Sequence, residues 1–385
     1  MATRVRSYSK INLGLAIGPP RPDGFHGLAT LYQTLAMHDL VTVEASQPRS
    51  QNRDLGHPTL TLTTNHAGVP TDSRNTAWKM VERALARLGI SAEVRIHIQK
   101  ELPVQGGMGA GSANAAAALI GLERELGVAL PEAERLAIAA EVGSDVPLFL
   151  IGGAVLGMGR GEVVSAMPDL PATPCVVAVP ELGVSTPRAF QEWDGLCESR
   201  ARAAELTSSP LPDRLEELSH VYASVSGFRP ATELTSDTSG IVRSRQGLSR
   251  SGTRQGGFEG RSKTSEQGSA QNGLAGNTLL ALVRTGIEND FEQVVFPQYP
   301  LLREIKRLLM GTTAGEADFS DLRPDGSSGK ALYAALSGSG SALFGLYSSV
   351  ADARAAQQRV QSSGCKAILT ETLPRAEYWG RMFAE

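Results

Sequence analysis

The first half of the chain alternates segments with strand spacing and segments with helical spacing. Residues 75–88 place apolar side chains at helical intervals, and Gly89 follows as a stop signal, so the pattern predicts an amphipathic helix. Residues 93–99 alternate branched apolar and polar side chains, which predicts a strand with one buried face. The segments 39–44 and 59–63 show a shorter alternation and predict two further strands.

Two more helices are predicted after the strand over 93–99. Residues 112–126 are rich in alanine and predict a helix that ends before Gly127. Pro131 opens another helix that continues to about Glu141, because proline is favourable in a first helical turn. Strands and helices in this order predict a compact α/β arrangement for this half of the chain.

The second half is organised differently. The segment 175–180 predicts a short buried strand, and we place a domain boundary before it, which gives domains over 1–170 and 171–385. Serine, glycine, arginine, threonine and glutamine dominate 235–275, a composition that cannot offset its ordering entropy by burial. We therefore expect a disordered insertion there, with a basic RNA-binding tail as the alternative. A smaller loop insertion is expected over 313–329.

Composition and charge narrow the class of protein. The 385 residues contain 37 Lys and Arg against 40 Asp and Glu, a net charge of −3, which disfavours a dedicated nucleic-acid binder. Cys175, Cys197 and Cys365 form no CxxC pair, so they indicate neither a zinc site nor a disulfide framework, and they fit a reducing compartment. The N-terminal segment lacks the apolar core of a signal peptide, and no stretch of about 18 apolar residues occurs. We expect a cytoplasmic protein.

The strongest chemical signal is a glycine-rich loop between the strand over 93–99 and the alanine-rich helix. Four glycines fall within residues 106–111, and Ser112 follows. Such a loop lets backbone N–H groups face one concavity, and the helix adds unpaired N–H groups and the positive end of its dipole. The combination is typical of a phosphate cradle, in which Ser112 can cap the helix, contact a phosphate or reach a metal ion. A plain glycine-rich turn is the alternative, since the loop has neither the Walker A lysine nor the dinucleotide spacing.

Two charged side chains stand out elsewhere. Lys10 and Asn12 lie two residues apart and point to one side of a strand, where a lysine can neutralise a phosphate. A surface lysine on an edge strand is the alternative. Asp145 lies in the turn 143–147 before an apolar run, where a carboxylate is costly unless it is paired. A helix-capping or turn aspartate is the alternative there.

Two further turns can contact a ligand. In the turn 23–27 the ring of Phe25 is next to the imidazole of His26, and such a pair can stack on and hydrogen-bond a planar ring. Residues 336–344 form a second glycine-rich turn that leads into a strand and can close over phosphates. Each segment is also compatible with an ordinary turn or hairpin loop.

In their order along the chain, these segments resemble the GHMP kinase superfamily, named for galactokinase and the homoserine, mevalonate and phosphomevalonate kinases. The loop 106–112 resembles its central ATP motif, and the turn 337–341 resembles its C-terminal motif. The segments 9–13, 23–26 and 143–147 are most similar to the branch whose substrate is a cytidine-diphosphate-linked methylerythritol.

The resemblance spans residues 5–195 and resumes over 277–347. It implies a two-domain α+β GHMP kinase fold, with an N-terminal ribosomal-protein-S5-domain-2-like domain, a C-terminal ferredoxin-like domain and a site in the cleft between them. It also implies that ATP donates its γ-phosphoryl group to the 2-hydroxyl of the cytidyl substrate, a step of the non-mevalonate isoprenoid route.

The resemblance further implies roles for individual residues. Asp145 would accept the proton of the substrate hydroxyl, and Lys10 would orient Asp145 and stabilise the nucleophilic oxygen. Mg²⁺ is implied through the ATP phosphates, with Ser112 as a candidate ligand. The implied ATP-binding stretch comprises Pro103, Val104, Gln105, Gly106, Gly107, Met108, Gly109, Ala110, Gly111, Ser112 and Ala113. The implied substrate pocket comprises Asn12, Phe25, His26 and Phe190.

The chain departs from the family pattern in places. The loop, usually PxGGGLGGGSSN, differs at Gln105, Met108, Ala110 and Ala113. Gln105 and Ala110 require a backbone that does not need a positive φ. Ala113 removes a hydroxyl and leaves Ser112 alone to contact phosphate or Mg²⁺. Phe25 is more often tyrosine in the family, and phenylalanine keeps the stacking while losing a hydroxyl.

Two other functions remain open at this stage. One is another GHMP enzyme, such as a homoserine or mevalonate kinase, and Lys10 with the turn 23–26 argues against it. The other is a non-catalytic nucleotide- or RNA-binding protein, and the presence of both Lys10 and Asp145 argues against it. We expect ATP, Mg²⁺ and a small-molecule substrate, no nucleic-acid or membrane partner, and a monomer or homodimer.

Overall fold

The computed structural model describes most of the chain. The described residues are 2–21, 24–46, 59–104, 106–207, 288–312 and 330–385. The insertions predicted over 235–275 and 313–329, together with Asp23 and Gln105, lie outside the described residues.

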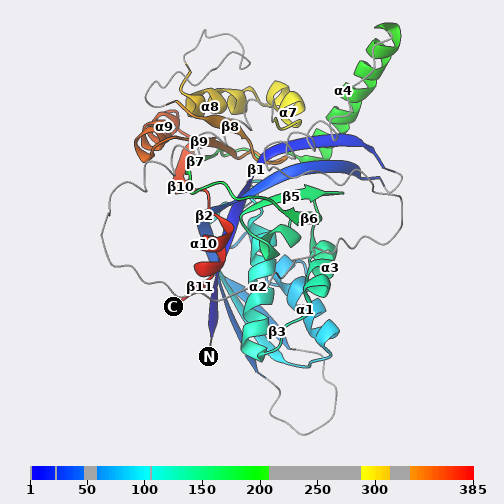
Figure 1. Ribbon diagram of the computed structural model, residues 1–385, viewed down its shortest axis with the longest axis vertical. Coiled ribbons are helices and arrows are strands. Elements are labelled where there is room, and N and C mark those ends of the chain that lie inside the picture. Colours follow the sequence, from blue (N-terminus) through cyan, green and yellow to red (C-terminus); the bar gives the residue numbers. More distant parts are fainter. Residues whose placement is uncertain (1, 22–23, 47–58, 105, 208–287, 313–329) are drawn as a thin grey trace, which may run out of the picture.

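Two long antiparallel strands, β1 (Thr3–Pro20) and β2 (His26–Ser46), form the centre of a seven-stranded sheet (Figure 1). The strand order is β11-β1-β2-β4-β3, while β5 pairs with β2 and β6 with β5. The shorter strands are β3 (Leu60–Thr64), β4 (Glu93–Gln99), β5 (Ala154–Met158), β6 (Val163–Ala166) and β11 (Phe383–Ala384). Among the described strands of this sheet, β3 and β4 form the one parallel pair.

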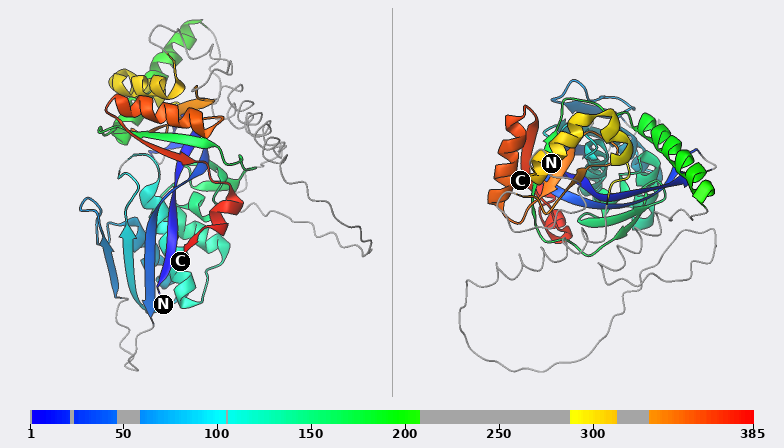
Figure 2. Two further views of the ribbon diagram at one scale, coloured as in Figure 1. Left: turned by 90° about the vertical axis from the view of Figure 1, so that its left-hand side faces the viewer. Right: turned by 90° about the horizontal axis from the view of Figure 1, so that it is seen from above.

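Helices α1 (Thr76–Leu88), α2 (Ala110–Leu126) and α3 (Glu132–Val142) lie on one face of this sheet, as the left view of Figure 2 shows. The helices predicted over 75–88, 112–126 and from Pro131 are confirmed to within about two residues at their ends. At α1 the reason is local: the side chain of Asn75 accepts from the N–H of Ala77, and Gly89 ends the helix with a φ of 65°.

A four-stranded antiparallel sheet lies beyond the first, in the order β10-β7-β9-β8. Its strands are β7 (Pro174–Val179), β8 (Tyr333–Leu336), β9 (Leu343–Leu346) and β10 (Lys366–Glu371). One face packs against β1 and β2, and the other is covered by helices (Figure 1). The helices of this half are α4 (Thr186–Thr207), α7 (Glu292–Gln298), α8 (Pro300–Met310) and α9 (Val350–Ser362).

The end of the chain returns to the first sheet. Helix α10 (Arg375–Gly380) lies beside that sheet in Figure 1, and β11 pairs with β1. The division at residue 170 stays a prediction, and the sheets show that the first one takes strands from both ends of the chain. Among the described helices, none combines the length and apolar character needed to cross a membrane.

The strand predicted over 39–44 is only the end of β2. In the earlier part of β2, every residue from 29 to 35 is buried, on both faces of the sheet. The second sheet packs on one face there, so the polar-apolar alternation of a half-exposed strand disappears. By contrast β4 alternates exposed and buried residues throughout, and its prediction over 93–99 is confirmed.

Candidate active site

The glycine-rich loop runs directly into the first turn of α2. Gly107 and Gly109 have φ values of 76° and 68°, a backbone conformation that favours glycine. Gly109 is the N-cap of α2 and offers no side chain for capping. The first N–H groups of α2 therefore have no intrahelical partner and no capping side chain, which leaves them available to an anion. Ala110 is the first helical residue, so the alanine there needs no positive φ.

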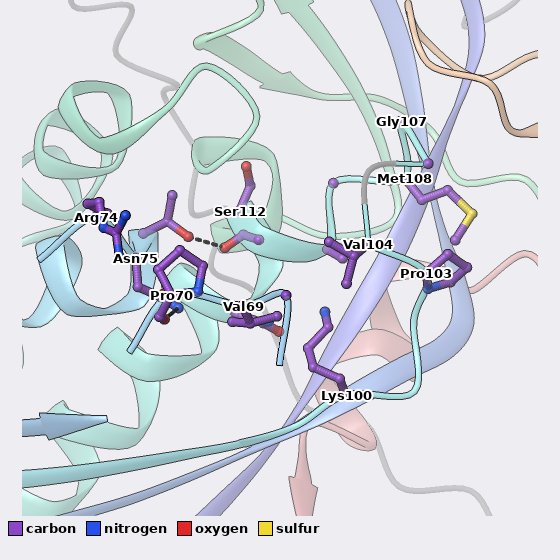
Figure 3. A pocket seen from close by; sticks show the side chains of 17 residues that line it. Val69, Pro70, Arg74, Asn75, Lys100, Pro103, Val104, Gly107, Met108 and Ser112 are labelled. Atoms are coloured by element: carbon purple, nitrogen blue, oxygen red, sulfur yellow. Dashed lines mark hydrogen bonds between the residues drawn. The ribbon is translucent and has the colours of Figure 1, made fainter. Parts of the chain in front are cut away.

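A cavity of about 380 Å³ opens beside this loop. Figure 3 shows Lys100, Val104 and Ser112 around it, with Ser112 at the start of α2. Of the predicted ATP-binding stretch, Ala113 is buried in the core behind the cavity and does not line it. The lining comes from Gly68, Val69, Pro70, Arg74, Asn75, Thr76, Lys100, Pro103, Val104, Gly106, Gly107, Met108, Gly109, Ala110, Gly111, Ser112 and Asn114.

Lys100 lines the same cavity just before the loop begins. Its side chain is buried and forms an ion pair with Asp39, which also accepts the N–H groups of Glu101 and Leu102. The carboxylate of Asp39 thus fixes the chain as it enters the loop, and the pairing offsets the cost of burying both charges.

The second glycine-rich turn, 337–341, packs directly on the first loop. The Ser337 hydroxyl donates to the carbonyl of Gly107 at 3.2 Å, and the N–H of Ala342 donates to the carbonyl of Gly106 at 3.3 Å. A side-chain carbon at Gly340 would lie 2.8 Å from the Cα of Gly107, closer than real contacts allow. Glycine is therefore required there for a close backbone approach, which joins the loops of the two sheets.

Lys10 and Asp145, 135 positions apart in the chain, meet beside the loop. The Lys10 Nζ lies 3.2 Å from the Asp145 Oδ2. The same Nζ donates to the Asn12 Oδ1 at 2.7 Å and to the Gly107 carbonyl at 2.9 Å. Lys10 is 3% exposed, and its three donor positions face three acceptors. The Asp145 side chain is 31% exposed and so can reach a ligand.

The glycine at 109 makes this convergence possible, and Gly143 shows how close the two segments lie. A side-chain carbon at Gly109 would lie 2.9 Å from the Phe149 ring and 3.2 Å from the Lys10 Cε. A side-chain carbon at Gly143 would lie 4.0 Å from the Ser112 Oγ, so the turn that carries Asp145 passes beside the start of α2. The loop, the amine and the carboxylate therefore share one site.

Sequence reasoning missed Tyr32 at this site. Its hydroxyl donates to the Asp145 Oδ1 at 3.0 Å. Burial first, and then the Asp145 carboxylate, hold the pKa of the Tyr32 phenol well above its usual value. Within an apolar strand a tyrosine is indistinguishable from a core residue. The available signal was its place on a strand paired with the one that carries Lys10 and Asn12.

A second group of predicted residues lies on the hairpin of β1 and β2 and on α4. The rings of His26 and Phe190 stack with centroids 4.9 Å apart, and Phe190 meets Phe291 edge-on at 5.0 Å. The His26 Nε2 lies 3.3 Å from the Asp194 Oδ1. His26, which is buried, and Phe190, distant in sequence, thus form one aromatic stack.

The remaining predicted residues are placed separately. Phe25 is 52% exposed, and the Arg160 guanidinium lies 5.1 Å from its ring. Asn12 is buried beside Lys10, and its Nδ2 donates to the Thr30 Oγ1 at 2.7 Å. Asn289, which sequence reasoning gave no site role, donates from its side chain to the carbonyls of Leu336 and Gly338, both at 2.8 Å. It thereby holds the second glycine-rich turn.

The sequence of this chain is similar to those of known GHMP kinases. Residues 75–153 match the family of GHMP kinases N terminal domain. A 4-diphosphocytidyl-2-C-methyl-D-erythritol kinase of Salinispora arenicola is 39% identical over 210 residues, which cover 54% of this chain and 63% of that protein. One of Streptomyces avermitilis is 38% identical over 215 residues, which cover 56% of this chain and 70% of that protein.

A solved structure agrees over almost the whole chain. The crystal structure of a 4-(cytidine 5'-diphospho)-2C-methyl-D-erythritol kinase matches with a TM-score of 0.57 and 22% identity, covering 96% of this chain and 99% of that one. This likeness confirms the two-domain α+β GHMP kinase fold that the sequence resemblance implied. In sequence, the match spans less than two thirds of the length of the Salinispora relative.

Proposed function

Because the chain belongs to the 4-diphosphocytidyl-2-C-methyl-D-erythritol kinase family, we propose that it phosphorylates the 2-hydroxyl of 4-diphosphocytidyl-2-C-methyl-D-erythritol with ATP. This is a step of the non-mevalonate route to isoprenoid precursors. The observation that carries the proposal is the 3.2 Å contact between the Lys10 ammonium and the Asp145 carboxylate beside the glycine-rich loop. A cation and a carboxylate at one phosphate cradle are the groups that phosphoryl transfer to an alcohol needs.

The loop and α2 would hold the triphosphate. Phosphoryl transfer leaves little covalent work for the protein, so positioning and charge stabilisation dominate. The N–H groups at the start of α2 and the positive end of its dipole favour anions. The cavity of about 380 Å³ on the same loop offers room for the rest of the nucleotide. The Ser337–Gly107 hydrogen bond supports the loop from the second sheet.

Asp145 and Lys10 would act on the substrate alcohol. As the hydroxyl oxygen forms its bond to the γ-phosphorus, the bond from that phosphorus to the β,γ-bridging oxygen breaks and ADP leaves. The hydroxyl proton passes to the Asp145 carboxylate. Lys10 stabilises the negative charge that develops on the oxygens and holds the carboxylate in place. Such general-base assistance contributes roughly 10²–10⁴-fold to a rate.

The residues present fit a Mg²⁺ ion carried with ATP. Mg²⁺ usually binds through one or two protein oxygens, substrate phosphates and water. The described residues contain no group of three His, Cys, Asp or Glu that would hold a metal on their own. The Ser112 hydroxyl, beside the turn that carries Asp145, is the protein oxygen that would hold it. When bound, Mg²⁺ neutralises phosphate charge.

The aromatic stack of His26 and Phe190 would lie against the cytosine ring and recognise it. Base-aromatic stacking is worth about 1–3 kcal/mol per base and suits a planar ring. Phe25 is more than half exposed and can lie against a bound base. The side chain of Asn12 is buried and hydrogen-bonded to Lys10 and Thr30, so it would act on the substrate by holding Lys10 in place. We further propose that the enzyme is cytoplasmic and acts as a monomer or homodimer.

A coupled ADP-release assay with a panel of alcohols tests the proposal. Turnover is expected with the cytidyl-methylerythritol substrate, and homoserine and mevalonate are the comparison acceptors. Preferred turnover of either comparison acceptor would assign the chain to another GHMP activity. ATP binding without turnover of any acceptor would contradict a kinase function.

A further inference from the structure

Tyr32 lies next to both members of the proposed catalytic pair, Lys10 and Asp145. It lies on β2 opposite Asn12 of β1 and next to Val155 of β5. Its side chain is 2% exposed, and its hydroxyl donates to the Asp145 Oδ1 at 3.0 Å. The Lys10 Nζ lies 5.4 Å from the centroid of its ring.

The ring is held by a slot that two glycines shape. A side-chain carbon at Gly157 would lie 2.6 Å from the Tyr32 Cε2, and one at Gly161 would lie 2.5 Å from its hydroxyl oxygen. Any larger residue at either position would collide with the ring or its hydroxyl. The backbone at these two glycines therefore lies close to the ring and its hydroxyl and limits where the phenol can point.

The two oxygens of Asp145 face different donors. Oδ1 accepts from Tyr32, while Oδ2 faces Lys10 at 3.2 Å. Two donors on the two oxygens fix the plane of the carboxylate, which otherwise turns freely about its terminal torsion. A carboxylate offers about four lone-pair positions, so two donors leave acceptor capacity for a substrate hydroxyl. The remaining exposure of 31% provides access to it.

We propose that Tyr32 is a positioning residue for the phosphoryl transfer, one that holds the Asp145 carboxylate in the orientation that accepts the substrate proton. This inference rests on the function proposed above. Tyr32 does not contact the reacting atoms itself; it acts through Asp145. A tyrosine phenol is protonated at neutral pH, and burial and the Asp145 carboxylate raise the pKa of Tyr32 further, so the hydroxyl stays a donor.

The first test replaces Tyr32 by phenylalanine, which keeps the ring and removes the hydroxyl. In Tyr32→Phe we expect kcat to fall about tenfold, the range that one hydrogen bond to a charged group supports. KM for ATP and for the cytidyl substrate should stay within about twofold, since neither binding surface changes. Tyr347→Phe is the matched control. The Tyr347 hydroxyl is also buried and donates to the Leu309 carbonyl at 2.9 Å, in the core between the four-stranded sheet and its helices. The kcat of Tyr347→Phe should be unchanged.

The second test asks whether the effect passes through Asp145. In an Asp145→Ala background, Tyr32→Phe should change the residual rate less than about twofold, because the group it positions is gone. An unchanged kcat in Tyr32→Phe would overturn the inference. The same tenfold loss in the Asp145→Ala background would also overturn it.

A crystal structure of Tyr32→Phe gives a readout that does not depend on the reaction. The inference predicts that the Asp145 carboxylate turns away from its orientation in the wild-type protein, and an unchanged orientation would contradict it. If the wild-type chain does not phosphorylate the cytidyl substrate, the proposed function fails, while this comparison still decides the role of Tyr32.

Discussion

Replacing Lys10 by methionine separates the chemical role of its ammonium from its structural role. Methionine keeps an unbranched side chain of similar length and removes the charge and all three donor positions. Three acceptors then lose a donor: the Asp145 Oδ2, the Asn12 Oδ1 and the Gly107 carbonyl. The structural cost depends on which of these acceptors can find another partner.

Two of the three acceptors keep another hydrogen-bond donor after the substitution. The Gly107 carbonyl still accepts from the Ser337 hydroxyl at 3.2 Å. Asp145 still accepts from Tyr32 and is 31% exposed to water. Only the Asn12 side chain, 2% exposed, loses its donor in a buried place. One unsatisfied buried acceptor costs about 1–3 kcal/mol, so we expect the free energy of unfolding to fall by about that amount.

The loss of turnover should be much larger. Removing one group that stabilises developing charge in a closed site costs about 10²–10³ in kcat. Equilibrium urea unfolding and the ADP-release assay on the same Lys10→Met sample measure the two effects. As a control, Arg135→Met removes a guanidinium that pairs with Glu123 at 2.8 Å away from the loop, and it should lower stability without lowering kcat. A Lys10→Met enzyme that keeps more than about a tenth of wild-type kcat would refute the reasoning.

Three further predictions address the other parts of the site. Asp145→Asn should bind ATP normally by calorimetry and lose at least about a hundredfold in kcat, and near-normal rates would exclude it as the base. Phe25→Ala should raise KM for the cytidyl substrate about 5- to 150-fold, the equivalent of a lost stacking contact, with kcat little changed. An unchanged KM would show that the cytosine ring does not stack on Phe25. Gly340→Ala should weaken ATP binding, because the added carbon would lie 2.8 Å from the Gly107 Cα, and unaltered affinity would show that the two loops do not depend on each other.

Local patterns in the sequence predict the local elements of this protein well. Helix α1 and strand β4 follow from residue spacing, because each packs one face on the core and exposes the other. The central part of β2 does not, because burial on both faces removes the alternation. The glycine-rich loop could also be predicted from the sequence, since its backbone angles at Gly107 and Gly109 favour glycine.

The site is harder to predict from the sequence because its residues are distant from one another along the chain. Neither Lys10 nor Asp145 specifies a partner alone; their contact depends on how β1, the loop and α3 pack together. Tyr32 carries no signal of its own, since an aromatic residue in a buried strand is ordinary core. Its role emerges only when the register places it opposite Asn12 and its hydroxyl reaches Asp145.

A crystal structure with a non-hydrolysable ATP analogue and the cytidyl substrate tests the central claim most directly. The account predicts the triphosphate against the loop 106–111 and the first N–H groups of α2, with the substrate hydroxyl between the γ-phosphate and the Asp145 carboxylate. A triphosphate bound away from that loop, or a hydroxyl out of reach of Asp145, would contradict it.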